Sequence, residues 1–178
     1  MPPKTSRTAA DDYRAKTSQE ITQLTRRANR YDPAPFGDPF SGITLVAEKV
    51  TEDNVGRHTD ARIVDALRRS LAAVRLDRAY VTWPHPDLLE EILSLEPSAL
   101  VAVGPGAVRA IDSLDYPLVK RRFAETTEGY WFAWTDGVSG LRLPALAPAL
   151  DDADAKRRFW RAFLAMRALA TGGAWTHP

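Results

Sequence analysis

The stretch that decides the fold is Ser98–Ile111, which reads SALVAVGPGAVRAI. A continuous apolar run is interrupted by Gly104-Pro105-Gly106, and apolar residues then resume at helical spacing. This pattern is typical of a strand that is buried on both faces and enters a helix through a tight turn, as in parallel sheets. In open α/β sheets, ligands bind where the carboxyl ends of the strands meet the following loops. The residues that follow each strand are therefore the first candidates for a functional site.

The sequence on both sides continues this alternation of short apolar strands and amphipathic helices. Strands are expected at residues 43–47, 79–82, 99–103, 130–134 and 141–143. Helices are expected at residues 60–76, 86–95, 105–114 and 152–170, with Pro86 in the first helical position of the second. Such an order predicts a three-layer α/β/α sandwich with a central, mostly parallel sheet. The domain is expected to span residues 41–171, followed by a tail at 172–178.

The first forty residues differ in composition from this domain. Residues 8–30 predict one polar helix with a thin apolar stripe through Tyr13, Ile21, Leu24 and Ala28, suited to docking on a surface. Residues 31–40, YDPAPFGDPF, contain prolines and a glycine that interrupt regular structure. We expect a linker with exposed aromatic side chains, and the whole of residues 1–40 packed on the domain.

Composition excludes several classes of function. The 178 residues carry 24 Lys and Arg against 23 Asp and Glu, so net charge indicates neither a nucleic-acid binder nor an enzyme for acidic substrates. Basic clusters at the N-terminus, at 120–122 and at 156–158 still allow basic patches. Without cysteine, thiolate metal sites and cysteine nucleophiles are excluded, and three histidines argue against a His-rich metal site. With no apolar leader or membrane-length run, a cytoplasmic protein is expected.

Chemically interesting side chains follow three of the expected strands. Glu48 and Lys49 follow the first, Trp83 and His85 the second, and Gly104-Pro105-Gly106 the third. Residues 144–148 could complete the same crevice, and a carboxylate, an imidazole and an indole there would form a plausible reaction site. The alternatives are ordinary ones. Glu48 and the nearby Glu52 and Asp53 would be solvated loop charges, and His85 a turn residue or helix N-cap.

Common cofactor and nucleophile motifs are absent. The Gly104-Pro105-Gly106 turn is no dinucleotide fingerprint, because Arg109 stands at the third glycine position and no acidic ribose partner is evident. Walker A, HExxH and GxSxG patterns are also missing. We therefore expect no cofactor and no metal.

The order of the segments resembles the uracil-DNA glycosylase superfamily over Ile43–Leu169, especially its compact bacterial and thermophilic branches. In those proteins a strand ending in a Gly-Glu-Ala-Pro-Gly motif precedes "GLDR…VYITN", "RPKVVVALGATAARAL", a His-Pro-Ser loop and a "KRRAWEDLKALRAL" helix. The matching segments here are ITLVAEKV (43–50), VRLDRAYVTW (74–83), EPSALVAVGPGAVRAI (96–111), and ALAPAL followed by KRRFWRAFLAMRAL (145–169). The resemblance covers about seven-tenths of the chain and implies the superfamily's α/β/α fold.

Departures from the family pattern fall on its working residues. Trp83 replaces the Asn that reads the uracil edge, and Lys49 stands where relatives hold a water-activating Asp or Asn or a permissive Ala. Ala147, before Pro148, replaces the histidine of the His-Pro-Ser loop. Glu48 is the one motif residue that remains in place. The resemblance thus implies a base other than plain uracil; by analogy with divergent members, this could be a modified cytosine of phage DNA in a defence role.

These residues predict a DNA glycosylase that flips out a modified or damaged base, hydrolyses its N-glycosidic bond and leaves an abasic site. The alternative is a catalytically inactive relative that binds DNA or a protein. DNA is the expected partner, with no membrane, and the protein is expected to be a monomer. The expected catalytic residues are Glu48, His85, Asp53 and Glu52. The expected base-binding residues are Trp83, Phe36, Phe40 and Lys49, and the expected DNA contacts are Arg57, His58, Lys120, Arg121, Arg122 and Pro148.

Overall fold

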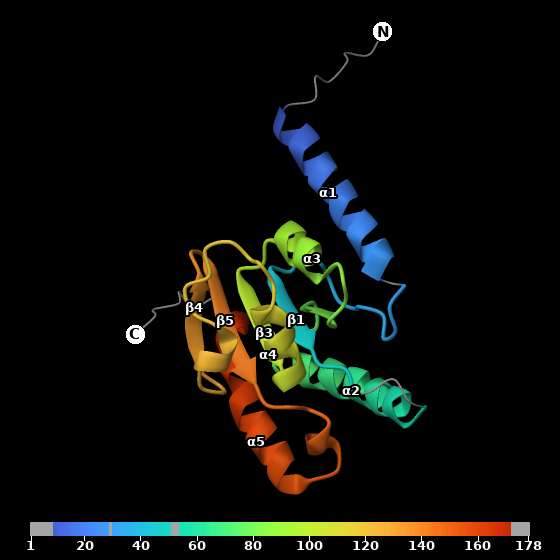
Figure 1. Cartoon of the computed structure of the whole chain (residues 1–178), viewed down its shortest axis with the longest axis vertical. Coiled ribbons are helices and arrows are strands. Elements are labelled where there is room, and N and C mark those ends of the chain that lie inside the picture. Colours follow the sequence, from blue (N-terminus) through green and yellow to red (C-terminus); the bar gives the residue numbers. More distant parts are fainter. Residues whose placement is uncertain (1–8, 29, 51–53, 172–178) are drawn as a thin grey trace.

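The computed structural model describes residues 9–28, 30–50 and 54–171, and a five-stranded sheet forms their centre (Figure 1). The strands are β1 (Ile43–Ala47), β2 (Tyr80–Thr82), β3 (Ala99–Val103), β4 (Trp131–Thr135) and β5 (Val138–Leu143). They lie in the order β2-β1-β3-β5-β4. The first four strands in this order are parallel, and only β4 pairs antiparallel, with β5. The mostly parallel central sheet expected from the sequence is confirmed.

Helices cover both faces of this sheet. The described helices are α1 (Ala9–Ala28), α2 (Asn54–Ala73), α3 (Leu88–Leu95), α4 (Pro105–Asp112), α5 (Ala153–Phe163) and α6 (Arg167–Ala170), with short 3₁₀ turns η1 (Phe123–Glu125), η2 (Pro148–Leu150) and η3 (Leu164–Met166). Apolar side chains of α2 and α5 form one buried cluster with the sheet. Those of α3 and α4 form a second cluster on the other face. The architecture is therefore a three-layer α/β/α sandwich.

Strand alternation explains why there are two clusters. All five side chains of β3 are buried, so this central strand is covered on both faces. Leu45 of β1 belongs to the cluster with α2 and α5, whereas its neighbour Val46 belongs to the cluster with α3 and α4. Successive side chains of a strand point to opposite faces. The same alternation continues into the first residue after a strand: Trp83, after β2, lies on the same face as Val81.

Several boundaries differ from the sequence-based expectation. α2 begins at Asn54, and α3 begins only at Leu88, so Pro86 lies in the preceding turn and not at the first helical position. β5 begins at Val138, because Gly140 in its middle lets the ring of Phe132 pack against the strand: a Cβ there would lie 2.4 Å from Phe132 Cζ. The expected helix 152–170 is divided into α5, η3 and α6.

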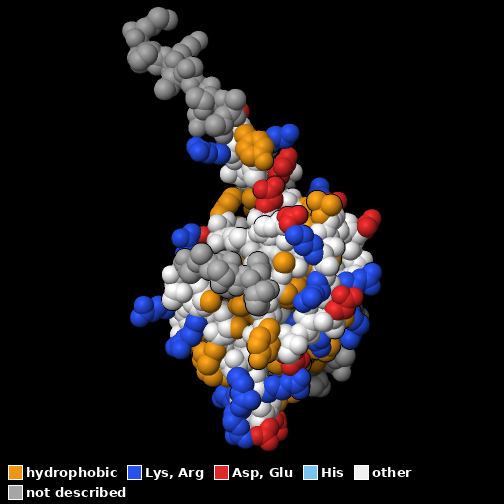
Figure 2. Space-filling view, turned by 90° about the vertical axis from the view of Figure 1, so that its left-hand side faces the viewer, with side chains coloured by type: hydrophobic (Ala, Val, Ile, Leu, Met, Phe, Trp, Pro, Cys, Tyr) orange, Lys and Arg blue, Asp and Glu red, His pale blue; other side chains and the backbone are white. Residues whose placement is uncertain are grey.

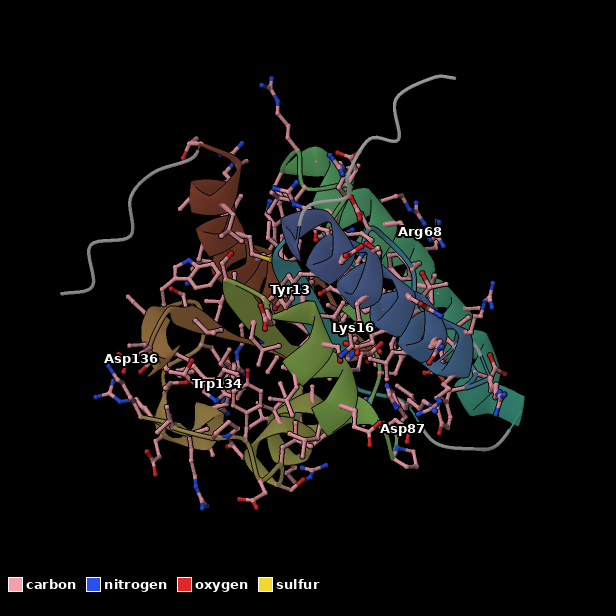
Figure 3. All side chains as sticks on the ribbon, turned by 90° about the horizontal axis from the view of Figure 1, so that it is seen from above. Tyr13, Lys16, Arg68, Asp87, Trp134 and Asp136 are labelled. Carbon is pink, nitrogen blue, oxygen red and sulfur yellow. The ribbon has the colours of Figure 1, made fainter. Side chains whose placement is uncertain are left out.

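α1 contacts the domain through its C-terminal half, against α3. Ile21 is buried and Leu24 is half-buried, while Tyr13 is 67% exposed. The first turns of α1 project away from the sandwich (Figure 1), and Tyr13 and Lys16 lie on this crossing helix when the molecule is seen from above (Figure 3). The second half of this polar helix thus makes its contacts with the domain.

Residues 31–40 lie along the outer edge of β2. The N–H of Phe36 donates to the carbonyl of Val81 at 3.0 Å, and the N–H of Val81 donates back to Phe36 at 2.8 Å. Phe36 is half-buried, with the guanidinium of Arg68 4.4 Å from its ring centroid; Arg68 is labelled on α2 in Figure 3. The expectation of exposed aromatics is correct for Phe40, which is 60% exposed, and wrong for Phe36.

Charged residues recur along the long helices. α1 and α2 each have 20 residues, and both carry arginines in several turns. Within the described residues, no helix combines the length and the apolar character that crossing a bilayer requires.

Candidate functional site

The chain changes direction across the sheet between β1 and β3. It leaves β1 for β2 on one side, returns through α3, and enters β3 on the other side of β1. In doubly wound α/β sheets, such a switch point opens a crevice outside the carboxyl ends of the two strands, where ligands bind. Glu48 follows β1 there, and Gly104 follows β3.

Glu48 is held against the turn that connects β3 to α4. Its backbone N–H donates to the carbonyl of Val103 at 3.0 Å, and its Oε2 accepts from the N–H of Gly106 at 2.7 Å. A Cβ on Gly104, whose φ is +88°, would lie 2.2 Å from the Glu48 Cδ, and one on Gly106 would lie 2.9 Å from the Glu48 Cβ. The two glycines therefore leave the space that the carboxylate occupies.

Burial raises the pKa of the Glu48 carboxyl above the ordinary glutamate value. The Gly106 N–H and the positive charge of Arg109 oppose this shift but do not cancel it. Desolvation disfavours the charged form of a carboxylate, so this group exchanges a proton more readily near neutral pH than a solvated glutamate does. A desolvated carboxylate beside a strand-end crevice can act as a general base or stabilise a developing positive charge.

His85 lies in a different environment, a buried hydrogen-bond network centred on Glu91 of α3. Glu91 accepts from the hydroxyls of Tyr80 at 2.6 Å and Thr82 at 2.9 Å, and its Oε2 lies 2.9 Å from His85 Nε2. The Asp87 N–H donates to His85 Nδ1 at 3.1 Å, so Nε2 carries the ring proton and donates it to Glu91. Both ring nitrogens are thus engaged inside the protein.

The aromatic ring of Tyr31 closes this network from outside. It stacks on His85 with ring centroids 4.8 Å apart, and its hydroxyl donates to Asp87 Oδ2 at 3.3 Å. His85 and Glu91 each have only 3% of the side chain exposed. Of the alternatives open from the sequence, that of a turn residue describes the observed contacts of His85, whereas the N-cap of α3 is Asp87.

Trp83 points away from both carboxylates. It is 2% exposed and packs in the cluster of α2 and α5 with Leu45 and Ala47. Its Nε1–H is buried with no hydrogen-bond partner among the described residues. Because the core covers the ring, a flipped base could stack on it only if this part of the domain opened.

The expectation of one cleft lined by Glu48, Trp83, His85 and Pro148 is therefore wrong. Glu48 faces the β3–α4 turn, His85 faces α3, and Trp83 faces α2 and α5. Pro148 is exposed and begins the η2 turn. Period-two alternation turns Trp83 to the face of α2 and α5, and burial keeps the side chain of His85 out of an open cleft.

The remaining expected residues have varied positions. Lys49 is exposed beside Glu48. Lys120 forms an ion pair with Asp136, and its backbone N–H donates to the Trp134 carbonyl at 2.7 Å. Arg121 and Arg122 are exposed. Figure 3 labels Trp134 and Asp136, and it labels Asp87 near α3. Glu52 and Asp53 lie outside the described residues. Arg57 and His58 lie in the first turns of α2, where the description covers the backbone alone.

Sequence reasoning missed two buried carboxylates, Glu91 and Asp60. Asp60 on α2 accepts from the Val50 N–H at 3.0 Å, and burial raises its pKa against the opposing charge of Lys49. Glu91 could have been found from helical spacing, since Leu88, Glu91 and Ile92 share one face. Asp60 carries no comparable signal, because it resembles a first-turn acid of the shorter helix expected there.

Within the described ranges, no three His, Asp or Glu side chains form a cluster that could hold a metal ion. No protein-family model matches the chain, and no curated protein shows significant similarity to it.

Proposed function

We propose that this protein hydrolyses the N-glycosidic bond of a modified or damaged base in DNA, with Glu48 as the principal carboxylate. The observation that carries the proposal is the desolvated Glu48 carboxylate at the β1–β3 switch point, where a ligand would meet it. The α/β/α sandwich and the resemblance of Ile43–Leu169 to uracil-DNA glycosylases support the same reading.

Glu48 would act on the sugar side of the bond. As the bond from C1′ to the base nitrogen lengthens, positive charge develops on the sugar, and a nearby carboxylate stabilises it. Glu48 would also orient a water molecule and accept its proton while the water oxygen bonds to C1′. The electron pair of the broken bond leaves with the base, which takes up a proton. The product is an abasic site.

Recognition of the base would differ from that of plain uracil. Phe40 precedes β1 and lies at the opposite end of that strand from Glu48. Lys49 is exposed beside Glu48 and can contact a flipped nucleotide directly. Trp83 and His85, in contrast, would have to leave buried positions to do so. We therefore infer that Lys49 carries the base contact beside Glu48, and that the enzyme accepts an enlarged base.

Contact with DNA would depend mainly on phosphates. The exposed Arg121 and Arg122, next to Lys120, supply positive charge. Each phosphate that is neutralised on duplex DNA releases counterions and adds about −0.9 to the log–log slope of affinity against salt. A filter-binding titration at several salt concentrations measures this slope, and affinity that does not change with salt would contradict the phosphate contacts.

The second candidate is a binding module without catalysis. In this reading Glu48 only caps α4, because its Oε2 satisfies a backbone N–H in the first turn of that helix. The buried hydrogen bond of His85 and the core packing of Trp83 favour this binding module, because neither side chain is available to a substrate.

Glu48→Gln separates the two candidates. The assay follows base release from labelled oligonucleotides that carry a panel of damaged and phage-type bases, read as alkali-labile strand breaks. We expect Glu48→Gln to slow release by about 10²-fold or more while DNA binding in a gel shift is kept. Glu90→Gln, at an exposed glutamate, is the matched control. If Glu48→Gln kept full activity, Glu52 or Asp53 would be the catalytic carboxylate. If the wild type released no base from any oligonucleotide, the binding module would be favoured.

A further inference from the structure

A hollow lies away from Glu48, in the layer of α2 and α5. It has a volume of about 790 Å³. Arg62, Ala66 and Arg69 of α2 form one wall. The other wall comes from α5, and η2 with the residues before it forms the floor. We call this feature the α2–α5 groove.

The floor of the groove is apolar. Leu146, Ala149 and Leu150 line it, together with Phe159 of α5. Trp160 forms part of the α5 wall, is 37% exposed, and stacks on the buried Phe163 with ring centroids 5.6 Å apart. A partly exposed indole fixed by a buried ring is typical of the aromatic anchors in protein interfaces.

The rim of the groove is basic. Arg62, Arg69, Lys156 and Arg157 line it together with Asp65, and Asp151 and Asp154 stand next to it as ion-pair partners of two of the arginines. Lys and Arg side chains gather at the end of the molecule where α5 begins, the lower end in Figure 2. Lys156 forms no ion pair with any residue that the structure describes. The groove thus combines an apolar floor with a cationic border.

The three arginines of the rim are paired with aspartates. Arg62 binds Asp151 at 2.6 Å and 3.2 Å, Arg69 pairs with Asp65, and Arg157 pairs with Asp154. Exposed pairs of this kind contribute only about 0–1 kcal/mol each, so a partner carboxylate can replace the aspartate at little expense. These aspartates would, however, repel a continuous row of phosphates. The pattern favours a protein segment with scattered carboxylates over a nucleic-acid backbone.

The two walls are formed by residues at helical spacing. Arg62, Ala66 and Arg69 stand at i, i+4 and i+7, and Ala153, Arg157 and Trp160 repeat the same spacing on α5. Each wall therefore spans about two helical turns, or about 10 Å. Amphipathic helices bind such grooves through apolar residues at i, i+4 and i+7.

We propose that the α2–α5 groove binds an acidic amphipathic helix of a partner protein. Its apolar side chains lie over Leu146, Leu150 and Trp160, and its carboxylates face Lys156 and the rim arginines. This interaction is independent of the chemistry at Glu48, which lies after β1 and faces α4.

The test uses a fluorescein-labelled, 14-residue helical peptide with Leu at i, i+4 and i+7 and Glu on either side, and measures fluorescence anisotropy with the full chain. We expect micromolar binding that weakens with salt, and no binding of a peptide in which Lys replaces each Glu. Lys156→Glu should weaken binding about 10-fold or more, because it places like charges together. Trp160→Ala should have an effect of similar size through the lost anchor.

Two matched controls keep the result interpretable. Arg161→Glu changes a cation next to Trp160 that does not line the groove, and Tyr13→Ala removes an exposed ring on α1. Both should bind the peptide as the wild type does. If the acidic peptide does not bind, or if Arg161→Glu weakens it as much as Lys156→Glu, the proposal fails. Binding of a labelled single-stranded oligonucleotide that Lys156→Glu abolishes, without peptide binding, would assign the groove to nucleic acid instead.

Discussion

Glu48 and Glu91 lie on the same face of the sheet, near the same ends of neighbouring strands, yet their surroundings differ. Glu91 is buried and accepts hydrogen bonds from Tyr80, Thr82 and His85. Glu48 is half-buried and, among the described residues, accepts one hydrogen bond, from Gly106. A buried carboxylate with three donors stabilises the fold, whereas one with few donors retains unused acceptor capacity. The difference identifies Glu48, not the more deeply buried Glu91, as the candidate for chemistry.

Removing the Glu91 carboxylate should give the largest change. Glu91→Ala leaves the buried hydroxyls of Tyr80 and Thr82 and the Nε2–H of His85 without their common acceptor. We expect the free energy of unfolding to fall by about 3 kcal/mol or more, which is a decrease in Tm of about 6–12 °C for a chain of this size. Thermal unfolding followed by circular dichroism measures it. Glu90→Ala, at the adjacent exposed position, should shift Tm by only about 1–2 °C. Equal decreases in Tm in the two variants would show that the hydrogen-bond network around Glu91 does not stabilise the fold.

A methyl group beside Glu48 should have an intermediate effect. Gly104→Ala combines a φ of +88° with a contact 2.2 Å from the Glu48 Cδ, whereas Gly137→Ala combines a φ of +83° with open space. We expect Gly137→Ala to lower the free energy of unfolding by about 1 kcal/mol, and Gly104→Ala by about 1–3 kcal/mol more.

Urea denaturation of the two single variants and of Gly104→Ala combined with Glu48→Ala measures this excess. In the double variant the excess should disappear, because the clashing carboxylate is gone. An excess that persists would show that the β3–α4 turn is strained for a reason other than Glu48.

Neutralising Glu48 should give the smallest change, and one of opposite sign. Because burial raises its folded-state pKa above 4.5, the wild type loses stability as pH rises through that pKa. Glu48→Gln lacks this loss. The variant should thus have a higher Tm than the wild type at pH 7, and the difference should vanish as pH falls below about 4.5. Differential scanning fluorimetry from pH 4 to pH 8 measures it, with Glu90→Gln as a flat reference. If Glu48→Gln were less stable than the wild type at pH 7, the Glu48 carboxylate would stabilise the fold, as that of Glu91 does.

The sheet was predictable because its signal is local. Apolar runs such as Ala99–Val103 fill both faces of a central strand, and no other element competes for that pattern. β5 was predicted three residues too short, because Ser139 and Gly140 have no apolar pattern and become strand only by pairing with β3 and packing under Phe132. Tertiary pairing decided that boundary.

The site was predictable only in part, for a different reason. Strand ends locate Glu48, and the topological rule places it at the switch point. Sequence proximity, however, suggested that Trp83 and His85 share its crevice, whereas side-chain direction and the donors of Glu91 decide otherwise. Glu91 itself resembled a solvated acid in the pair Glu90-Glu91. Its burial follows from helical phase, which the spacing to Leu88 and Ile92 indicates in the sequence.

The pairing of Phe36 with Val81 has a consequence for solubility. β2 is a terminal strand of the sheet, and an uncovered terminal strand offers unpaired N–H and C=O groups to other chains. Phe36 occupies both outward groups of Val81, and the Asp38 N–H donates to the Arg78 carbonyl at 2.9 Å, so residues 36–38 shield this edge. A chain shortened to begin at Ser41 would keep every strand and still expose a template for intermolecular strand addition. Residues 36–38 thus cover a sheet edge that, if exposed, would favour aggregation.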